Sequence, residues 1–246
     1  MTVIRLCAAG DVHGRRYFAV FSASLKSLVG VKPDICVFAG DMVDEGKVED
    51  LAPIIEEVRS KFPGIPIISI FGNEEYHELE AVFVKRYPDL IWLNDSPAIL
   101  TVKGVKVGFV GTRGALEKLT FWQRRHKPEL ARVYRERPKV LKKLLLEVKK
   151  YADVTVLVSH YAPTFVTVRG EPEKIYPFMG SRDMERMIKE VKPDIVIHAH
   201  AHNARVTEAR LDSVRVYNVS VPARHGVTLI EFVPRKNLLS FMGVKT

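Results

Sequence analysis

The chain alternates short apolar runs with segments in which apolar residues recur every three or four positions. Five runs are mainly apolar: 3–9, 35–39, 67–71, 154–158 and 195–197. Runs of this kind are typical of strands that are buried on both faces of a sheet. Helical spacing appears between them, in 18–28, 51–58, 79–87, 130–148 and 184–188. Strands that alternate with helices form βαβ units, so the pattern predicts an α/β fold.

Other parts of the chain depart from strict alternation. Residues 99–110 read as a hairpin that turns at Lys103-Gly104, and 91–93 reads as a short strand. The segment 205–242 carries short runs separated by Gly, Pro and Asp, which suggests antiparallel strands. The Gly- and Pro-containing loop 169–181 is long enough to fold over a site as a lid.

Composition places the chain among soluble globular proteins. It has 246 residues, 47% of them apolar, and no linker that would divide it, so we expect one domain over 1–246. No apolar run approaches membrane-spanning length, and the start at Met1 lacks a signal-peptide pattern, which predicts a cytoplasmic protein without membrane insertion. Cys7 and Cys36 lie in apolar runs and are expected in the core. One Gln and five Asn favour a thermophilic source.

The net charge of +9 is concentrated in one segment. Residues 122–150 contain eleven Lys and Arg against three Glu, a local charge of +8. The segment 120–151 reads as a helix that Pro138 should break or kink. One apolar face is expected, consisting of Leu130, Val133, Leu141, Leu144, Leu145 and Val148. The basic face is either solvated or a flank that binds a polyanion such as nucleic acid, without base readout because only Trp122 and Tyr134 are available for stacking.

Side chains able to ligate metal follow the apolar runs. The run 195–197 leads directly into three alternating histidines, a spacing that suits metal ligation. Five runs end in such residues: Asp11 with His13, Asp41, Asn73, His160, and His200 with His202. A lone Asp after a strand is usually a turn or capping residue. Because all five runs end in a side chain able to ligate metal, we expect these side chains to meet beyond the carboxyl ends of the strands of one sheet. Two carboxylates, one amide and four imidazoles exceed the needs of one four-coordinate ion and suggest two metals. Such a pair clamps a phosphoryl group and activates water.

The order of these blocks resembles the calcineurin-like metallophosphoesterases. The matching stretches are Gly10-Asp11-Val12-His13, Gly40-Asp41, Gly72-Asn73, Ser159-His160 and Ala199-His200-Ala201-His202. The resemblance implies a four-layer αββα sandwich of two mixed β-sheets flanked by helices. It also implies two divalent metals, of which we expect manganese, with iron, zinc, nickel or magnesium as alternatives. By resemblance Asp11, His13 and His202 would hold one metal, Asn73, His160 and His200 the other, and Asp41 would bridge them.

Two positions depart from the family pattern. Ala199 replaces a Gly, a change that the turn should survive. Glu74 replaces the histidine credited with stabilising the transition state or protonating the leaving group. We hypothesise that His77 supplies the missing imidazole; a surface histidine, or a reaction without a protein acid, is the alternative.

The pattern gives less support for a role of the other basic residues in the site. His198 should pack or hydrogen-bond rather than ligate metal, and His126 should lie on the surface. Arg113, Arg224 and His225 could reach a substrate phosphate, although loop arginines are mostly solvated.

The sequence thus favours a hydrolase of phosphomonoesters or phosphodiesters, in which a hydroxide bridging two metals attacks the phosphorus. Its catalytic residues would be Asp41, Asn73 and His77. The alternative is a metal-binding module that binds a polyanion or a protein partner but turns over weakly, as Glu74 suggests.

Overall fold

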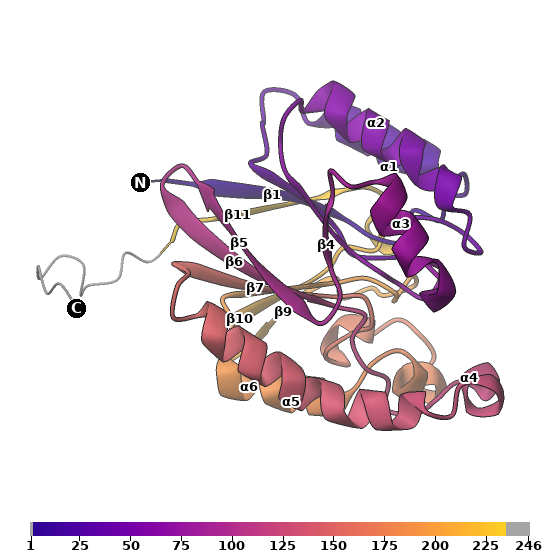
Figure 1. Ribbon diagram of the computed structural model, residues 1–246. Helices are drawn as coiled ribbons and strands as arrows, with labels where there is room; N and C mark the ends of the chain where they lie inside the picture. The colour runs from indigo at the N-terminus through magenta and orange to yellow at the C-terminus, as the bar shows by residue number, and fades with distance from the viewer. Residues whose placement is uncertain (1, 235–246) are drawn as a thin grey trace, which may run out of the picture.

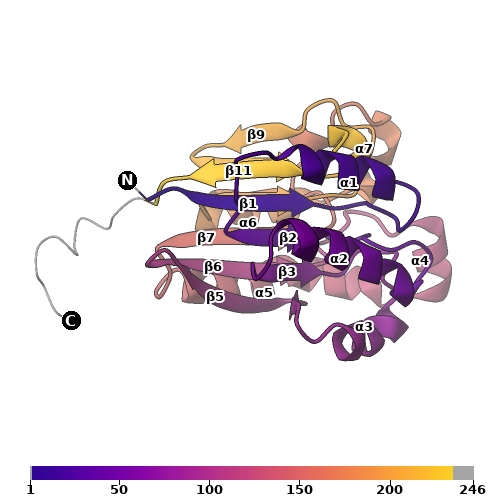
Figure 2. The ribbon, with the colours of Figure 1, turned by 90° about the horizontal axis from the view of Figure 1, so that it is seen from above.

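Two mixed β-sheets stack face to face in the computed structural model, which describes residues 2–234 (Figure 1). The first sheet has the order β11-β1-β2-β3-β4: Thr228–Phe232, Ile4–Ala9, Ile35–Phe38, Ile67–Ile70 and Ile91–Leu93. The second has the order β5-β6-β7-β8-β10-β9: Ser96–Val102, Val105–Thr112, Val154–Ser159, Ile195–His198, Val214–Asn218 and Glu208–Leu211. Strands β1 to β4 are parallel to one another, and β11 is antiparallel to β1 (Figure 2).

Helices cover both outer faces of the two sheets and complete four layers. The first sheet is covered by α1, α2 and α3: Phe18–Ser27, Leu51–Lys61 and Glu80–Arg86. The second is covered by α5 and α6: Leu130–Val148 and Arg182–Val191. Two short helices are α4 and α7: Phe121–His126 and Val221–Arg224. Four 3₁₀ helices are η1 to η4: Val48–Asp50, His77–Leu79, Val166–Val168 and Glu173–Phe178. None of the helices in residues 2–234 has the length and apolarity that crossing a membrane requires.

Strand alternation separates the core into layers. Leu6 and Ala8 of β1 pack between the two sheets, whereas Cys7 and Ala9 face the helices of the first sheet. Successive side chains of a strand point to opposite faces, so a strand buried on both faces is apolar throughout, as the sequence predicts. Cys7 and Cys36 are register neighbours on β1 and β2 and are free and buried, in agreement with the predicted core role.

The predicted basic helix is interrupted at a different proline. The break falls between α4 and α5, where Lys127 has a non-helical conformation (φ −141°, ψ 57°) and Pro128 disfavours a helical residue before it. Helix α5 continues through Pro138, so of the predicted break or kink the break is wrong; Pro138 is buried within the helix. Val133, predicted on the apolar face, is 37% exposed.

The C-terminal part is more varied than the antiparallel strands predicted for 205–242. Strands β9 and β10 are antiparallel, as expected, but β10 is parallel to β8. The final strand, β11, returns to the first sheet. Positions 235–242 of that prediction lie outside the described residues. The predicted hairpin turning at Lys103-Gly104 is confirmed as β5 and β6.

Candidate metal centre

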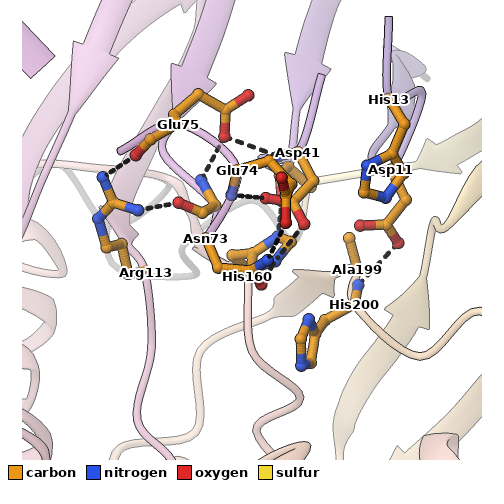
Figure 3. A network of polar contacts seen from close by, with 12 residues as sticks. Asp11, His13, Asp41, Asn73, Glu74, Glu75, Arg113, His160, Ala199 and His200 are labelled. Atoms are coloured by element: carbon orange, nitrogen blue, oxygen red, sulfur yellow. Dashed lines mark hydrogen bonds and ion pairs between the residues drawn. The ribbon is translucent and has the colours of Figure 1, made fainter. Parts of the chain in front are cut away.

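Two groups of ligand-capable side chains meet where the strands of both sheets end (Figure 3). Asp11, His13 and His202 form the first group. Asp41, His160 and His200 form the second. In each group one ligand atom per residue lies within 4.8 Å of the others. Residues far apart in sequence therefore converge as the strand-end pattern predicts.

The backbone is held in an unusual conformation at four of these residues. Asp11, His13, Asp41 and His200 have φ values of 56°, 49°, 50° and 71°. The left-handed region costs a non-glycine residue roughly 1–2 kcal/mol, so the surrounding fold must impose it. Such strain is concentrated at functional sites.

Close approach of two loops explains the glycine that precedes Asn73. A Cβ on Gly72 would lie 2.2 Å from Asp41 Oδ1 and 2.5 Å from the Asp41 amide nitrogen. Only glycine lets the loop after β3 pass this close to the loop after β2. Asn73 and Asp41 thereby reach the same histidine, His160.

His160 is the centre of the second group. Its Nε2 lies 3.3 Å from Asp41 Oδ2 and 3.1 Å from Asn73 Oδ1, and its Nδ1 lies 3.0 Å from the carbonyl oxygen of Ala39. The carbonyl holds a proton on Nδ1 and turns Nε2 toward the site. Burial would lower the pKa of His160, but the charge and hydrogen bond of Asp41 raise it to about 9. The raised pKa reflects the negative charge around Nε2, and a metal ion bound there would take the place of the proton.

His200 completes this group with a neutral ring. Burial and the charge of His160 lower the pKa of His200 to about 3, so its imidazole keeps a free lone pair at neutral pH. Its backbone N–H donates to Asp11 Oδ2 at 2.8 Å, which ties the two groups together. The residue before it, Ala199, is fully buried, and its carbonyl oxygen accepts from the Ala201 N–H at 2.9 Å across a tight turn.

The first group contains buried polar atoms without partners. Asp11 Oδ1 and His13 Nδ1 are buried and make no hydrogen bond among the described residues, although Asp44 Oδ1 lies 3.4 Å from His13 Nδ1. Nε2 of His202 lies 3.4 Å from both Asp11 Oδ2 and His13 Nε2. Burial would raise the pKa of Asp11, but hydrogen bonding and charge from His202, with the charge of His160, lower it. A buried carboxylate with an unpartnered oxygen beside two imidazoles fits a bound cation.

Glu75 holds the loops that carry the ligands, a role that the strand-end pattern missed. Its buried carboxylate accepts four backbone N–H groups, from Gly72, Asp41, Met42 and Val43, at 2.6–3.3 Å. Burial and the charge of Asp41 raise the pKa of Glu75 to about 7 despite these bonds. No local pattern in the sequence marks this role, because the four donors belong to backbone groups.

Arg113 holds the same loop from its other side and is not a free phosphate binder. Its guanidinium donates to the carbonyl oxygens of Gly72 and Glu75 (Figure 3). It also donates to Glu80 Oε1 at 2.8 Å. It is 4% exposed. Arg113 thus orients the backbone around Asn73.

The other basic residues considered for the site either hydrogen-bond to nearby groups or lie exposed on the surface. Arg224 donates to two carbonyl oxygens and to Glu208, and His225 is exposed. His198 is fully buried and hydrogen-bonds Thr167 Oγ1 at 2.7 Å, and burial lowers its pKa to about 4. His126 is exposed, as predicted.

Glu74 has definite partners in place of the family histidine. Its carboxylate accepts from Asn73 Nδ2 at 3.0 Å and from the Glu45 amide at 2.9 Å. The first bond leaves Asn73 Oδ1 facing His160. Glu74 therefore positions an amide ligand, and the sequence contains no signal for this role.

A cleft of about 560 Å³ opens beside the second group. Asn73 and His200 line its inner end, and His77 lines its wall. The His77 side chain is 42% exposed and its Nδ1 lies 2.9 Å from Glu80 Oε1. The structure thus places His77 on the same cleft as two predicted ligands.

Solved structures show the same architecture. A phosphopantetheinyl hydrolase from Mycobacterium tuberculosis superposes with a TM-score of 0.66 at 15% identity, over 89% of this chain and 90% of that one. A putative 5'-nucleotidase from Staphylococcus aureus gives 0.60 at 16%, over 88% and 48%. The Haemophilus influenzae NAD nucleotidase gives 0.55 at 13%, over 95% and 54%, so the chain spans about half of either nucleotidase. Comparison with curated protein sequences gives no match.

This sandwich, with two groups of histidine and aspartate at its strand ends, defines a metal-dependent phosphoesterase. The model of the calcineurin-like phosphoesterase family matches residues 4–204. The chain therefore belongs to that family.

Proposed function

We propose that the protein hydrolyses phosphomonoesters or phosphodiesters at a centre of two divalent metal ions. The observation that carries the proposal is the pairing of two ligand groups, linked by the His200 amide bonded to Asp11. Asp11, His13 and His202 would hold one ion, and Asn73, His160 and His200 the other. Bound there, the ions would supply a hydroxide nucleophile and neutralise charge on the phosphoryl oxygens. Manganese is our preferred metal.

The chain's own residues fix the geometry of this centre. Asp41 belongs to the second group, and the charge of Asp11 acts on it, which supports the proposed role as the bridging carboxylate. The Glu74 amide donates to Asp41 Oδ1 at 2.7 Å, and Glu75 holds the Asp41 amide, so this carboxylate has little freedom. Asn73 is oriented by Glu74. Fixed groups of this kind stabilise developing charge without reorganisation.

Metal removal followed by metal addition tests the proposed reaction. Chelator treatment should abolish the hydrolysis of p-nitrophenyl phosphate and bis-p-nitrophenyl phosphate, because the proposed nucleophile is a hydroxide that the metal ions would supply. Adding Mn²⁺, Ni²⁺, Zn²⁺ or Mg²⁺ in turn should restore release of the chromophore with at least one ion. Silence on both esters with metal bound would reject the enzyme and favour the weak-turnover binding module. The ratio of the two rates gives the preference for monoester or diester.

We further propose that His77 protonates the leaving alcohol, since it lines the cleft that leads from Asn73. His77→Ala should slow hydrolysis of an alkyl phosphate about 10²-fold while changing p-nitrophenyl phosphate turnover less than threefold, because nitrophenolate leaves without a proton. His126→Ala, an exposed histidine on α4, is the control. Equal rates of wild type and His77→Ala on the alkyl ester would exclude the role.

The basic segment 122–150 is partly neutralised by its neighbours. Ion pairs with other elements join Arg137 to Asp95, Lys127 to Glu78 and Lys142 to Glu190. Two pairs lie within the segment itself, Lys139 with Glu136 and Lys150 with Glu147. Four arginines on α4 and the first half of α5 have no ion pair among the described residues: Arg124, Arg125, Arg132 and Arg135. Their field supports attraction of an anionic substrate. Binding of nucleic acid by this segment stays a prediction, and rates of hydrolysis that are insensitive to salt would argue against it.

A further inference from the structure

The cleft beside the second ligand group has a lining that the proposed reaction does not explain. From its inner end at Asn73 and His200 it extends outward between the 3₁₀ helix η2 and helix α4. Its volume of about 560 Å³ lies within the range of small-molecule sites, roughly 300–1,000 Å³. A phosphate held at the ligand groups would therefore have its ester substituent in this cleft.

Two exposed aromatic rings line the cleft. Trp122 on α4 is 55% exposed, and Tyr76, at the start of η2, is 42% exposed. Leu116 and Leu130 add apolar surface between them. Exposed aromatic side chains that converge on one cleft are typical of sites for flat, apolar groups.

Helix α4 is fixed to the rest of the fold, so the backbone that carries Trp122 has little freedom to move. Thr120 and Gln123 form a capping box at the start of the helix. Gln123 is buried, and its Nε2 donates to the Tyr134 hydroxyl at 3.0 Å, which ties α4 to α5. A platform fixed in this way loses little entropy when a ligand stacks on it.

The cations of the cleft already have carboxylate partners. Arg113 and His77 both pair with Glu80, and Lys127 pairs with Glu78. Among the described residues, the cleft therefore offers no free cation to a second phosphate. The group that enters it should be uncharged.

We propose that the cleft binds an uncharged planar aromatic group, such as a nucleobase, on the alcohol side of a substrate with a single phosphate ester. This inference rests on the proposed function and names its substrate class. Trp122 is the stacking residue. Stacking on an aromatic side chain is worth about tenfold or more in affinity per base.

Matched substrates test this specificity. Adenosine 5'-monophosphate and ribose 5-phosphate are esters of similar primary alcohols and differ in the base, as 2-naphthylmethyl phosphate and ethyl phosphate differ in the ring. In at least one pair, wild type should have a higher kcat/KM for the aromatic substrate than for the non-aromatic one. Trp122→Ala should lower the kcat/KM for that aromatic substrate about tenfold. The non-aromatic member should change less than twofold. Phe121→Ala is the matched control, because Phe121 is 73% exposed on the same helix and does not line the cleft.

Binding without a phosphate separates this inference from the proposed function. Calorimetric titration with adenosine and with 2-naphthylmethanol should show binding to wild type and to Phe121→Ala, and at least tenfold weaker binding to Trp122→Ala. That result would support the cleft inference even in a protein that hydrolyses no ester. The inference would be overturned if Trp122→Ala lost kcat/KM equally on both members of each pair, or if wild type bound neither adenosine nor 2-naphthylmethanol. Hydrolysis of the esters by wild type would still support the proposed function.

Discussion

Replacing Asp41 by asparagine should lower kcat/KM for p-nitrophenyl phosphate by about 10³-fold, which corresponds to roughly 4 kcal/mol of transition-state stabilisation. Asparagine keeps the shape of the side chain and an oxygen for the Glu74 N–H, now 2.7 Å from Asp41 Oδ1. It removes the negative charge that faces His160 and that, in the proposed centre, would bind both metal ions. The rate should therefore fall although the fold remains. The measurement is steady-state kinetics with metal in excess, accompanied by a count of bound metal, which should fall below that of wild type.

Asp89→Asn is the control for this substitution. Asp89 is 73% exposed and pairs with Arg59 on the surface, so its loss should change kcat/KM less than twofold. An Asp41→Asn enzyme that kept more than a tenth of wild-type activity would show that this carboxylate is not central to the reaction.

Replacing Glu75 by glutamine should destabilise the protein by about 3 kcal/mol, because two buried backbone N–H groups lose their acceptor. The Glu75 carboxylate accepts four backbone N–H groups, and a glutamine amide would set its own N–H₂ against two of them. The loops that carry Asp41 and Asn73 would shift with them, so kcat/KM should also fall. Urea unfolding of the metal-free protein at pH 6, below the pKa of about 7, measures the effect. Because burial and the charge of Asp41 raise this pKa above its ordinary value, ionisation of Glu75 lowers the stability of the wild type as the pH rises through 7, and the difference between the two proteins should shrink at pH 8.

The exposed Glu49 provides the comparison for Glu75. Glu49→Gln changes the same functional group on the surface and should alter the free energy of unfolding by less than about 0.5 kcal/mol. Equal stability of Glu75→Gln and Glu49→Gln would mean that the four amides do not depend on a carboxylate.

The strand-end pattern predicted the site because parallel strands bring their carboxyl ends to a common edge. Asp11, Asp41 and Asn73 follow three neighbouring strands of one sheet, and His160 and His200 follow two neighbouring strands of the other. The sandwich itself came from the resemblance, because alternation of strands and helices indicates an α/β fold without giving the number of sheets.

The supporting residues were hidden because their partners are backbone groups of distant loops. Nothing local marks Glu75 as the acceptor of amides from residues 41–43, and Arg113 in its loop resembled a phosphate binder until Gly72 and Glu80 were seen to occupy it. The cleft was equally hidden, since it depends on α4 ending at His126 and on Trp122 facing outward. Tertiary packing decided these features, and propensity did not.

The number of divalent ions bound by the wild-type protein tests the account most directly. The protein should be stripped with chelator, titrated with Mn²⁺ in a calorimeter and analysed for metal after dialysis. Binding of two ions per chain, with activity returning as the second site fills, is the predicted result. Binding of one ion or none at full activity would contradict a centre built from two ligand groups.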